Sequence, residues 1–499
     1  MRTLSRGIGA GLVSSGWLAG LSIVLAPIYV HLLGIEGYGL IGLYTAILSI
    51  GGLLDLALSA TVSREIAWKQ ARAAEQHEIG PLLHSVEIVY WLVSSGLAVM
   101  LLIAAVVFDP DWIRASTLTD EQVEGALALM LLSLAIQLPG GLYSASLIGL
   151  HRQAHCAVLL AGFGTLRGVG AALFTWGLSN DIRAFFLFYV VVNLIQLIWL
   201  RWQTWSYVKA QGGQPFFAVK YLRSIRQGAG AMFLITAMGM MLSQIDKIVL
   251  TFLVPLESLG HYTLAWALAS GLTIIATPVV QGFGARFSAL VSTYGDREFE
   301  NQLNIASQLT YALVIPLAVT ISLFAKSIMV AWVRDADVAS ASASATLLPL
   351  LALGTAMMAC TYPLLIALYA KKEYKPALLV QFFFLLLFFP LLLWLVNSLG
   401  VLGAALSWSI YGVSVFATYF ILTAVRYGSR LFLGLFRAFI SITVTSFIVV
   451  WLIMQFLGLV ESEVLVLLVM GLALAGGWLL SVSVCPDLRH ALGNLLKAV

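Results

Sequence analysis

Five charged residues fall inside long apolar stretches of the sequence: Arg167, Lys247 and Lys326 are basic, and Asp55 and Asp246 are acidic. A charged side chain in a membrane-spanning segment is costly, so it usually faces a polar interior, a partner or a ligand. Basic groups there could hold an anion through charge-assisted hydrogen bonds. A carboxylate could carry a proton, help bind Na⁺ or form a salt bridge between helices.

The two aspartates leave their roles open. Adjacent residues on a helix point about 100° apart, so we expect Asp246 and Lys247 not to pair and each to need a partner on another helix. Asp55 needs a partner as well, and Arg167 is one candidate. Arg167 lies in a glycine-rich segment, which leaves room either for such a carboxylate or for a ligand.

Three further assignments also have two interpretations. Lys326 could face a polar interior, or it could extend toward the membrane surface and leave only its stem in lipid. Arg64 and Arg286 come at the inner ends of predicted spans, where basic residues commonly anchor a helix on the cytoplasmic side. Either position could also place a cation at the mouth of a cavity.

The composition determines which elements carry these residues. The 499-residue chain is 61% hydrophobic and 10% charged, whereas soluble domains carry about 25% charged residues. Apolar runs of about 20 residues recur, which is the length of a membrane-spanning helix. The runs are continuous and not alternating, so they favour helices over a β-barrel. We therefore predict an all-α polytopic membrane protein.

The apolar runs predict fourteen spans. They fall near residues 10–33, 39–62, 85–108, 124–150, 156–178, 183–205, 228–253, 261–286, 304–331, 346–370, 376–397, 401–425, 432–458 and 464–484. With the N-terminus inside, 21 of the 27 Lys and Arg residues fall in inner loops and tails and 3 in outer loops. This asymmetry predicts that both termini are cytoplasmic.

A short motif occurs twice, because Glu36-x-x-Gly39 reappears as Glu257-x-x-Gly260 between similar apolar runs. Such repeats are typical of duplicated transporters. We predict two pseudo-symmetric six-helix bundles plus two C-terminal helices. The boundaries are 1–205 for the first bundle, 206–227 for a cytoplasmic linker, 228–425 for the second bundle, and 426–499 for the extra helices and tail.

Residues 27–64 and 246–272 resemble the Wzx-type polysaccharide flippases of the multidrug/oligosaccharidyl-lipid/polysaccharide superfamily. The resemblance implies a central cavity between two bundles. It implies a lipid substrate, an oligosaccharide on undecaprenyl pyrophosphate, moved from the inner to the outer face of the bacterial cytoplasmic membrane. A polysaccharide polymerase and a chain-length regulator are the partner proteins that it implies.

The resemblance also suggests a site. His31 stands where relatives often carry arginine, so the charge at this position would be weaker or dependent on pH. The predicted cationic cavity for the pyrophosphate consists of His31, Arg64, Arg167, Lys247, Arg286 and Lys326. Asp55 and Asp246 are assigned to coupling with H⁺ or Na⁺, or to pairing between helices. The sequence has no P-loop and no metal-ligand spacing among its three cysteines, so we expect no cofactor, and no nucleic acid partner.

Two other function classes fit the sequence less well. A drug/cation antiporter of the MATE type would share the fold, but its cavity would hold acidic residues, and it would have twelve spans. Three intramembrane cations against two acids favour an anionic lipid substrate. A membrane glycosyltransferase or polymerase would need a large outer loop with an acidic catalytic residue, and the longest one, near 109–123, is short. We therefore expect a transporter and not an enzyme.

Overall fold

The computed structural model of the chain describes residues 2–107, 113–221, 231–293, 296–333, 338–457, 463–485 and 488–489. All regular secondary structure in these ranges is helical, which confirms the predicted all-α class. The elements are α1 (Arg2–Gln70), η1 (Ala73–Glu78), α2 (Ile79–Val107), α3 (Asp120–Gly149), α4 (Gln153–Leu178), α5 (Ile182–Ala210), α7 (Ala231–Leu253), α8 (Leu256–Thr293), α9 (Asp296–Leu323), α10 (Ala325–Val333), α11 (Val338–Ala370), α12 (Tyr374–Leu399), α13 (Val401–Tyr427), α14 (Ser429–Leu457) and α15 (Glu463–Val484).

The predicted spans overlap these helices. In the described part of the chain, 11 helices are long and apolar enough to cross a membrane. The predicted spans 10–33 and 39–62 both lie in α1, which is bent at Gly34, where φ is 73°. The predicted span 304–331 is divided between α9 and α10 by a break at Phe324. Large apolar side chains such as Trp176 and Trp394 cover the outside of the helices, as a multi-pass membrane protein requires.

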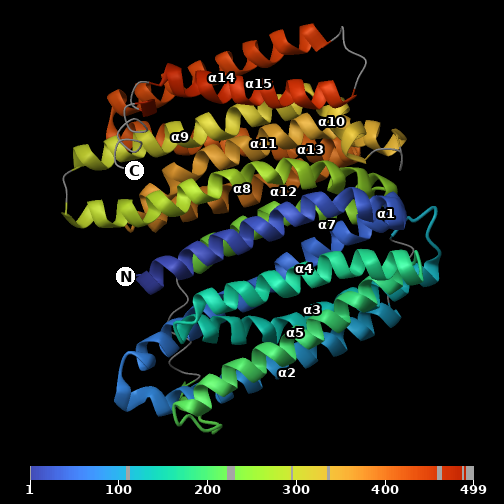
Figure 1. Ribbon diagram of the computed structural model, residues 1–499, viewed down its shortest axis with the longest axis vertical. Helices are drawn as coiled ribbons and strands as arrows, with labels where there is room; N and C mark the ends of the chain where they lie inside the picture. The colour runs from blue at the N-terminus through green and yellow to red at the C-terminus, as the bar shows by residue number, and fades with distance from the viewer. Residues whose placement is uncertain are drawn as a thin grey trace. The chain divides into compact units, whose positions relative to one another are not determined.

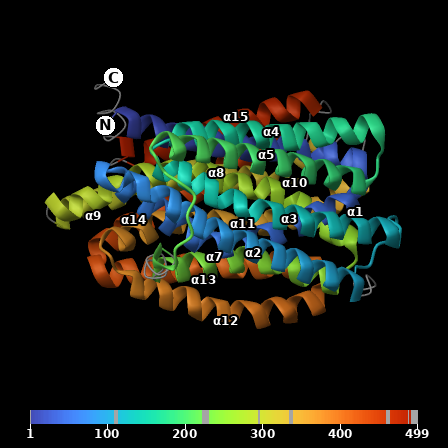
Figure 2. The same cartoon turned by 90° about the horizontal axis from the view of Figure 1, so that it is seen from below.

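Two compact units divide the chain, Met1–Gly260 and His261–Val499. In the first unit, α1 and α5 each pack against both α3 and α4, so these four helices form a closed ring. Figure 1 shows α3, α4 and α5 side by side, and Figure 2 shows them from a second direction. Helix α2 packs against α3, and α7 packs against α1. Part of the predicted linker, residues 222–227, lies outside the described residues.

In the second unit, α11 packs against α9 and α13, and α14 packs against α9 and α15. Glycines bring α11 and α13 very close. A Cβ added to Gly412 would lie 2.3 Å from the carbonyl oxygen of Gly354. Small residues at such crossings allow backbone contact, which is how helices associate in lipid without a hydrophobic driving force. Arg426 and Glu373 form an ion pair where α13 ends and α12 begins.

The repeated Glu-x-x-Gly motifs lie against each other within the first unit. A Cβ added to Gly260 would lie 2.2 Å from the carbonyl oxygen of Ile35, and one added to Gly39 would lie 2.8 Å from that of Leu256. Only glycine fits where two backbones approach this closely. The repeated glycines therefore form the contact between the turn in α1 and the start of α8.

Glu36 fixes the neighbouring loop. Its carboxylate is only 2% exposed. It accepts hydrogen bonds from the backbone and side chains of Ser116 and Thr117, at 2.5–2.8 Å, and from the backbone of Leu118 at 3.1 Å. A buried carboxylate is tolerated when several donors replace the lost water. The second copy, Glu257, is exposed, so only the first motif holds a loop in this way.

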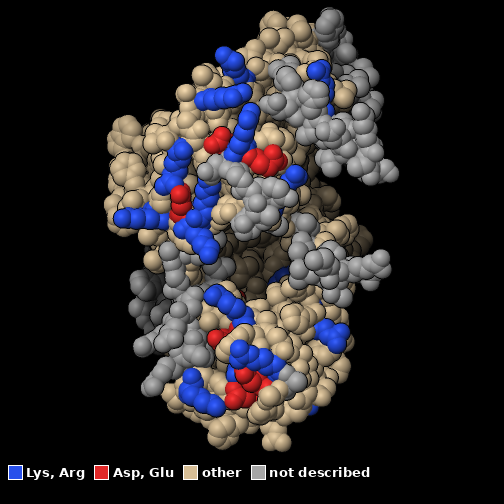
Figure 3. Space-filling view, turned by 90° about the vertical axis from the view of Figure 1, so that its left-hand side faces the viewer, with Lys and Arg blue, Asp and Glu red and all other residues tan. Residues whose placement is uncertain are grey.

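Charged residues gather at the ends of the helices. Figure 3 shows one face of the molecule, where Lys and Arg side chains cluster with fewer Asp and Glu among them. At the corner between α1 and α2, Lys69 contacts Glu78 at 2.5 Å and Arg72 contacts Glu75 at 2.9 Å. The Lys69 ammonium, first through its hydrogen bond, holds the pKa of Glu78 below its usual value, although burial opposes this.

Candidate functional site

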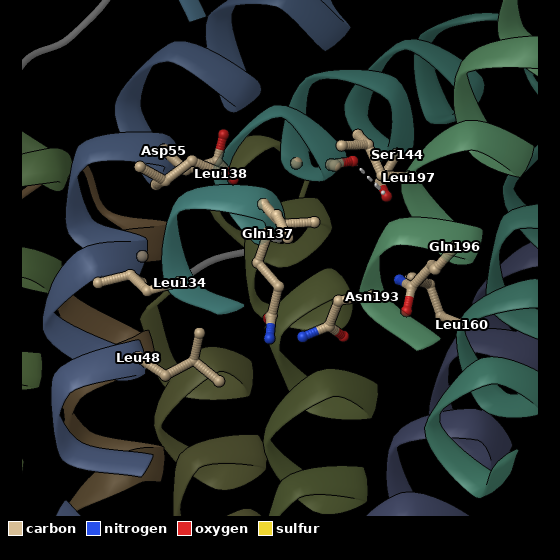
Figure 4. Close-up of a pocket in the computed structure, with 14 residues that line it drawn as sticks. Leu48, Asp55, Leu134, Gln137, Leu138, Ser144, Leu160, Asn193, Gln196 and Leu197 are labelled. Carbon is tan, nitrogen blue, oxygen red and sulfur yellow. Dashed lines mark hydrogen bonds between the residues drawn. The ribbon is translucent and has the colours of Figure 1, made fainter. Parts of the chain in front are cut away.

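A cavity of about 300 Å³ opens inside the ring of α1, α3, α4 and α5. Its polar lining consists of Asp55, Gln137, Ser144, Asn193 and Gln196, and most of the remaining lining is leucine or glycine. Figure 4 shows the Gln137, Asn193 and Gln196 side chains extending into the space between the helices. Neither Lys nor Arg is among the described residues that line it. The cavity is therefore polar and carries one formal negative charge.

A chain of hydrogen bonds borders this cavity and joins all four helices. The Tyr44 hydroxyl on α1 bonds the Ser133 hydroxyl on α3 at 2.8 Å. Asn193 on α5 donates to Ser133 at 2.6 Å, and Arg167 on α4 donates to Asn193 at 2.5 Å. Gln137 adds a branch by donating to Tyr44 at 2.8 Å. We call Tyr44, Ser133, Asn193 and Arg167 the polar belt.

Aromatic rings lie beyond the belt, on the side away from Asp55. Phe185, Phe186 and Tyr189 on α5 contact Tyr29 and Tyr44 on α1, with ring centroids 5.0–5.8 Å apart. These edge-to-face contacts are favourable for aromatic pairs. Tyr29 and Tyr44 lie on either side of the bend at Gly34, near Glu36. The cavity residues of α1 come later in the chain, between Tyr44 and Gln70, where the helix ends. The belt and the rings thus separate the cavity from the end of the unit that carries Glu36.

Asp55 lies on the other side of the belt. Its Oδ1 accepts from Ser59 at 2.6 Å and from Tyr90 at 2.7 Å. The carboxylate rests on Gly141 of α3, where an added Cβ would lie 2.0 Å from Oδ2. The Arg167 guanidinium donates to Asn193, whereas Asp55 accepts from Ser59 and Tyr90. The partner of Arg167 in this structure is thus the Asn193 amide, and the pairing of Asp55 with Arg167 stays a prediction.

Asp246 and Lys247 were expected not to pair, but they lie close together in this structure. The Lys247 ammonium lies 3.7 Å from Asp246 Oδ1, and both side chains are buried, at 2% and 0% exposure. Lys247 also donates to Gln244 at 3.2 Å. The prediction that neighbours on a helix would not pair was wrong. The prediction used only the directions of the Cα–Cβ bonds. The four-carbon stem of Lys247 is flexible, so its ammonium can fold back along the helix when burial excludes water.

The other predicted cations are more exposed. His31 and Arg64 on α1 are exposed in the first unit, and Arg286 on α8 and Lys326 on α10 are exposed in the second. Arg167 is joined to the cavity lining through its hydrogen bond to Asn193.

An acidic residue on α2, Glu87, was not among the predicted site residues. Glu87 is 3% exposed and accepts from Tyr143 and from Arg201, each at 2.6 Å. His84 lies 3.5 Å from its other oxygen. This cluster ties α2, α3 and α5 together between the cavity and the ends of those helices. Glu87 lies just inside predicted span 85–108. A carboxylate at the start of an apolar run was therefore the sequence feature that could have identified it.

The cavity amides were also missed. Gln137, Asn193 and Gln196 lie inside predicted spans, where an amide is unusual enough to mark a polar interior. The prediction considered only residues with formal charge. No group of three or more His, Cys, Asp or Glu side chains in the described residues could hold a metal ion.

Comparisons with known proteins agree with this architecture. The chain resembles the lipid II flippase MurJ in an inward closed conformation, with a TM-score of 0.69 and 15% identity, over 95% of this chain and 97% of MurJ. It resembles an inward-facing MATE multidrug transporter of the MOP superfamily, with a TM-score of 0.66 and 15% identity, over 82% and 94%. A MATE transporter from Vibrio cholerae gives a TM-score of 0.54 and 14% identity, over 87% and 98%. These likenesses establish the shared fold.

The sequence comparisons are more specific about the family. No curated protein matches the chain. Residues 4–283, more than half of the chain, match a family model described as "Polysaccharide biosynthesis protein". This match covers the polar belt, the cavity and both Glu-x-x-Gly motifs. The family predicted from the resemblance of residues 27–64 and 246–272 is thus confirmed: the chain belongs to the polysaccharide biosynthesis protein family.

Proposed function

We propose that this protein is a flippase that moves an oligosaccharide linked to undecaprenyl pyrophosphate from the cytoplasmic to the outer face of the bacterial inner membrane. The observation that carries the proposal is a cavity rich in amides inside an apolar helical bundle, in a chain of the polysaccharide biosynthesis family. A sugar head group needs hydrogen-bonding groups along its path, whereas its lipid tail can stay in the bilayer. The protein catalyses no covalent step in this account.

Alternating access is the proposed mechanism, with both termini cytoplasmic and the chain organised as two pseudo-symmetric bundles. The cavity lies toward the end of the first unit that carries Gln70, which the charge asymmetry assigns to the cytoplasm. The belt and aromatic rings close it toward the other end. Exposed cations, among them His31 and Arg64, are the proposed contacts for the pyrophosphate.

Coupling to an ion gradient is part of the proposal. Asp55 faces a cavity that is large enough for water, and its hydrogen bonds come from hydroxyls rather than from a cation. A proton or Na⁺ that neutralises Asp55 would change the affinity of the cavity for its substrate, and by linkage the substrate would change the affinity for that ion. Asp246 is a second candidate, although its nearby ammonium already compensates its charge.

Deletion of the gene followed by analysis of lipid-linked intermediates tests the function. The proposal predicts that a lipid-linked oligosaccharide accumulates on the inner face and that the wild-type chain clears it. The variant Arg167→Ala should clear it poorly at equal expression. Normal surface polysaccharide without accumulation in the deletion strain would refute the assignment.

A MATE-like drug/cation antiporter is the second candidate, and one observation favours it. The described residues that line the cavity include a carboxylate but neither Lys nor Arg, which suits an organic cation. Vesicles with an imposed pH gradient distinguish the two functions. Accumulation of a fluorescent organic cation that depends on Asp55 would support the antiporter, and its absence together with lipid flipping would support the flippase.

A further inference from the structure

We propose that the cavity between α1, α3, α4 and α5 binds a single sugar ring of the head group and selects neutral or basic sugars over acidic ones. The inference rests on the proposed flippase function and assigns a specificity to this one cavity. It is drawn from the size of the cavity, its hydrogen-bonding groups and its charge.

Size is the first consideration. A volume of about 300 Å³ corresponds to roughly ten water molecules at about 30 Å³ each. That is more than a cation with its inner ligands needs, and it suits one pyranose ring. Gly52, Gly140 and Gly141 contribute to the lining, so the backbone leaves room that side chains would otherwise fill.

The hydrogen-bonding groups match a ring of hydroxyls. Carboxamides offer both donors and acceptors, as sugar hydroxyls do. The belt already holds Asn193 and Gln137 in fixed orientations, so the site is organised before a ligand arrives. Gln196 Oε1 is buried without a hydrogen-bond partner in this structure. Both hydrogen bonds to Asp55 reach Oδ1, which leaves Oδ2 to accept from a ligand hydroxyl.

Apolar side chains complete the match. Leu134, Leu138, Leu160 and Leu197 line the cavity beside the amides, and Figure 4 shows leucines and amides around the same space. A pyranose ring has C–H faces and a polar rim, so a mixed lining can contact both. A dehydrated metal ion would gain nothing from the leucines.

Charge sets the selectivity. Among the described lining residues, Asp55 is the charged one, and the guanidinium of Arg167, which is not in the lining, donates to Asn193. A uronic acid would bring a second carboxylate into a confined site, and like charges at close range repel. A neutral hexose has no such cost, and an amino sugar would be attracted. The pyrophosphate, for the same reason, must bind elsewhere.

The first test measures occupancy without transport. A cysteine is placed in the cavity by Gln196→Cys and alkylated in the purified full-length protein, in which the native Cys156, Cys360 and Cys485 are buried. Undecaprenyl pyrophosphate carrying one glucose should slow alkylation at least about fivefold, as expected when a ligand fills a confined pocket. The same lipid carrying glucuronic acid, or no sugar, should leave the rate unchanged. The control Val158→Cys, whose native side chain is 66% exposed, should react equally in every case.

Three results would overturn the inference: equal protection by the glucose and glucuronic acid lipids, protection by the sugar-free lipid, or protection by Na⁺ alone. The last would identify a cation site instead. If none of the lipids slowed the alkylation of Gln196→Cys, the inference would also be overturned.

The second test separates the inference from the flippase function. Reconstituted wild-type protein should flip the glucose lipid at least about tenfold faster than the glucuronic acid lipid, and Asp55→Asn should reduce this ratio by removing the like charge. Flipping of both lipids at equal rates would leave the protein a flippase and refute the sugar selectivity. Flipping of neither lipid would count against the flippase function, while the alkylation test would still decide whether the cavity binds sugar.

Discussion

The bond between Arg167 and Asn193 joins α4 to the rest of the polar belt, and its strength can be measured by a double-mutant cycle. The two groups are 2.5 Å apart, and Asn193 is 2% exposed. A hydrogen bond to a charged group contributes about 1.5–3 kcal/mol to stability. We expect Arg167→Ala to lower the free energy of unfolding by about this amount, because the Asn193 oxygen then stays buried without a donor.

The variant Asn193→Ala should cost more, because it also removes the 2.6 Å bond to Ser133. The double variant should be less destabilised than the sum of the single variants by about 1.5–3 kcal/mol. Reversible denaturant titration of the full chain in detergent micelles measures all four proteins. Arg183→Ala is the control, since its own side chain is 38% exposed and that of its partner Glu121 is 83% exposed, and exposed pairs contribute about 0–1 kcal/mol. A coupling energy below about 0.5 kcal/mol would show that the Arg167–Asn193 bond does not make the proposed contribution to stability.

The remaining predictions concern coupling and the glycine contact. Asp55→Asn should slow transport and flatten its dependence on pH, measured in vesicles at fixed gradients; an unchanged pH profile would remove this residue from the coupling role. Gly260→Ala should destabilise the protein by about 1–3 kcal/mol through overpacking, measured by unfolding in detergent, whereas Gly162→Ala, with open space around it, should be tolerated. Glu36→Gln should lower the thermal unfolding midpoint because the amide cannot accept all five hydrogen bonds, and Glu257→Gln at the exposed copy should have little effect. A similar loss in both glutamine variants would contradict the role assigned to the buried carboxylate.

The sequence was informative about elements because lipid constrains them strongly. Long apolar runs in a bilayer must be helices, and the predicted spans accordingly overlap helices throughout. The bend at Gly34 and the break at Phe324 were less readable, since both neighbouring segments are equally apolar. The repeat of Gly39 and Gly260 is visible in the sequence, but the sequence does not show that the backbones at these two glycines pack together.

The site was harder to predict because formal charge is an incomplete guide to a polar interior. Arg167 was expected to contact a ligand or Asp55, whereas in the structure it donates a hydrogen bond to Asn193. Sequence spacing does not show which of several helices face each other, so the ring of α1, α3, α4 and α5 could not be derived. Amides such as Gln137 and Gln196 carry no charge to draw attention, yet they supply most of the hydrogen-bonding capacity of the cavity.

The conformation of a long side chain was the third limit. The geometry of a helix gives the direction of each Cα–Cβ bond. For short side chains, this direction determines which residues can be in contact. Lys247 shows that a flexible stem can bring a charge back to its neighbour, at 3.7 Å from Asp246.

Flipping by the purified protein is the measurement that tests the central claim most directly. The full chain is reconstituted into vesicles with undecaprenyl pyrophosphate-linked oligosaccharide on the inner leaflet, and an impermeant glycosidase outside reports sugar that reaches the outer leaflet. The account predicts cleavage that requires the protein, falls in Arg167→Ala and stays normal in Arg183→Ala. Cleavage no faster than in protein-free vesicles, with the protein folded and an ion gradient applied, would contradict it.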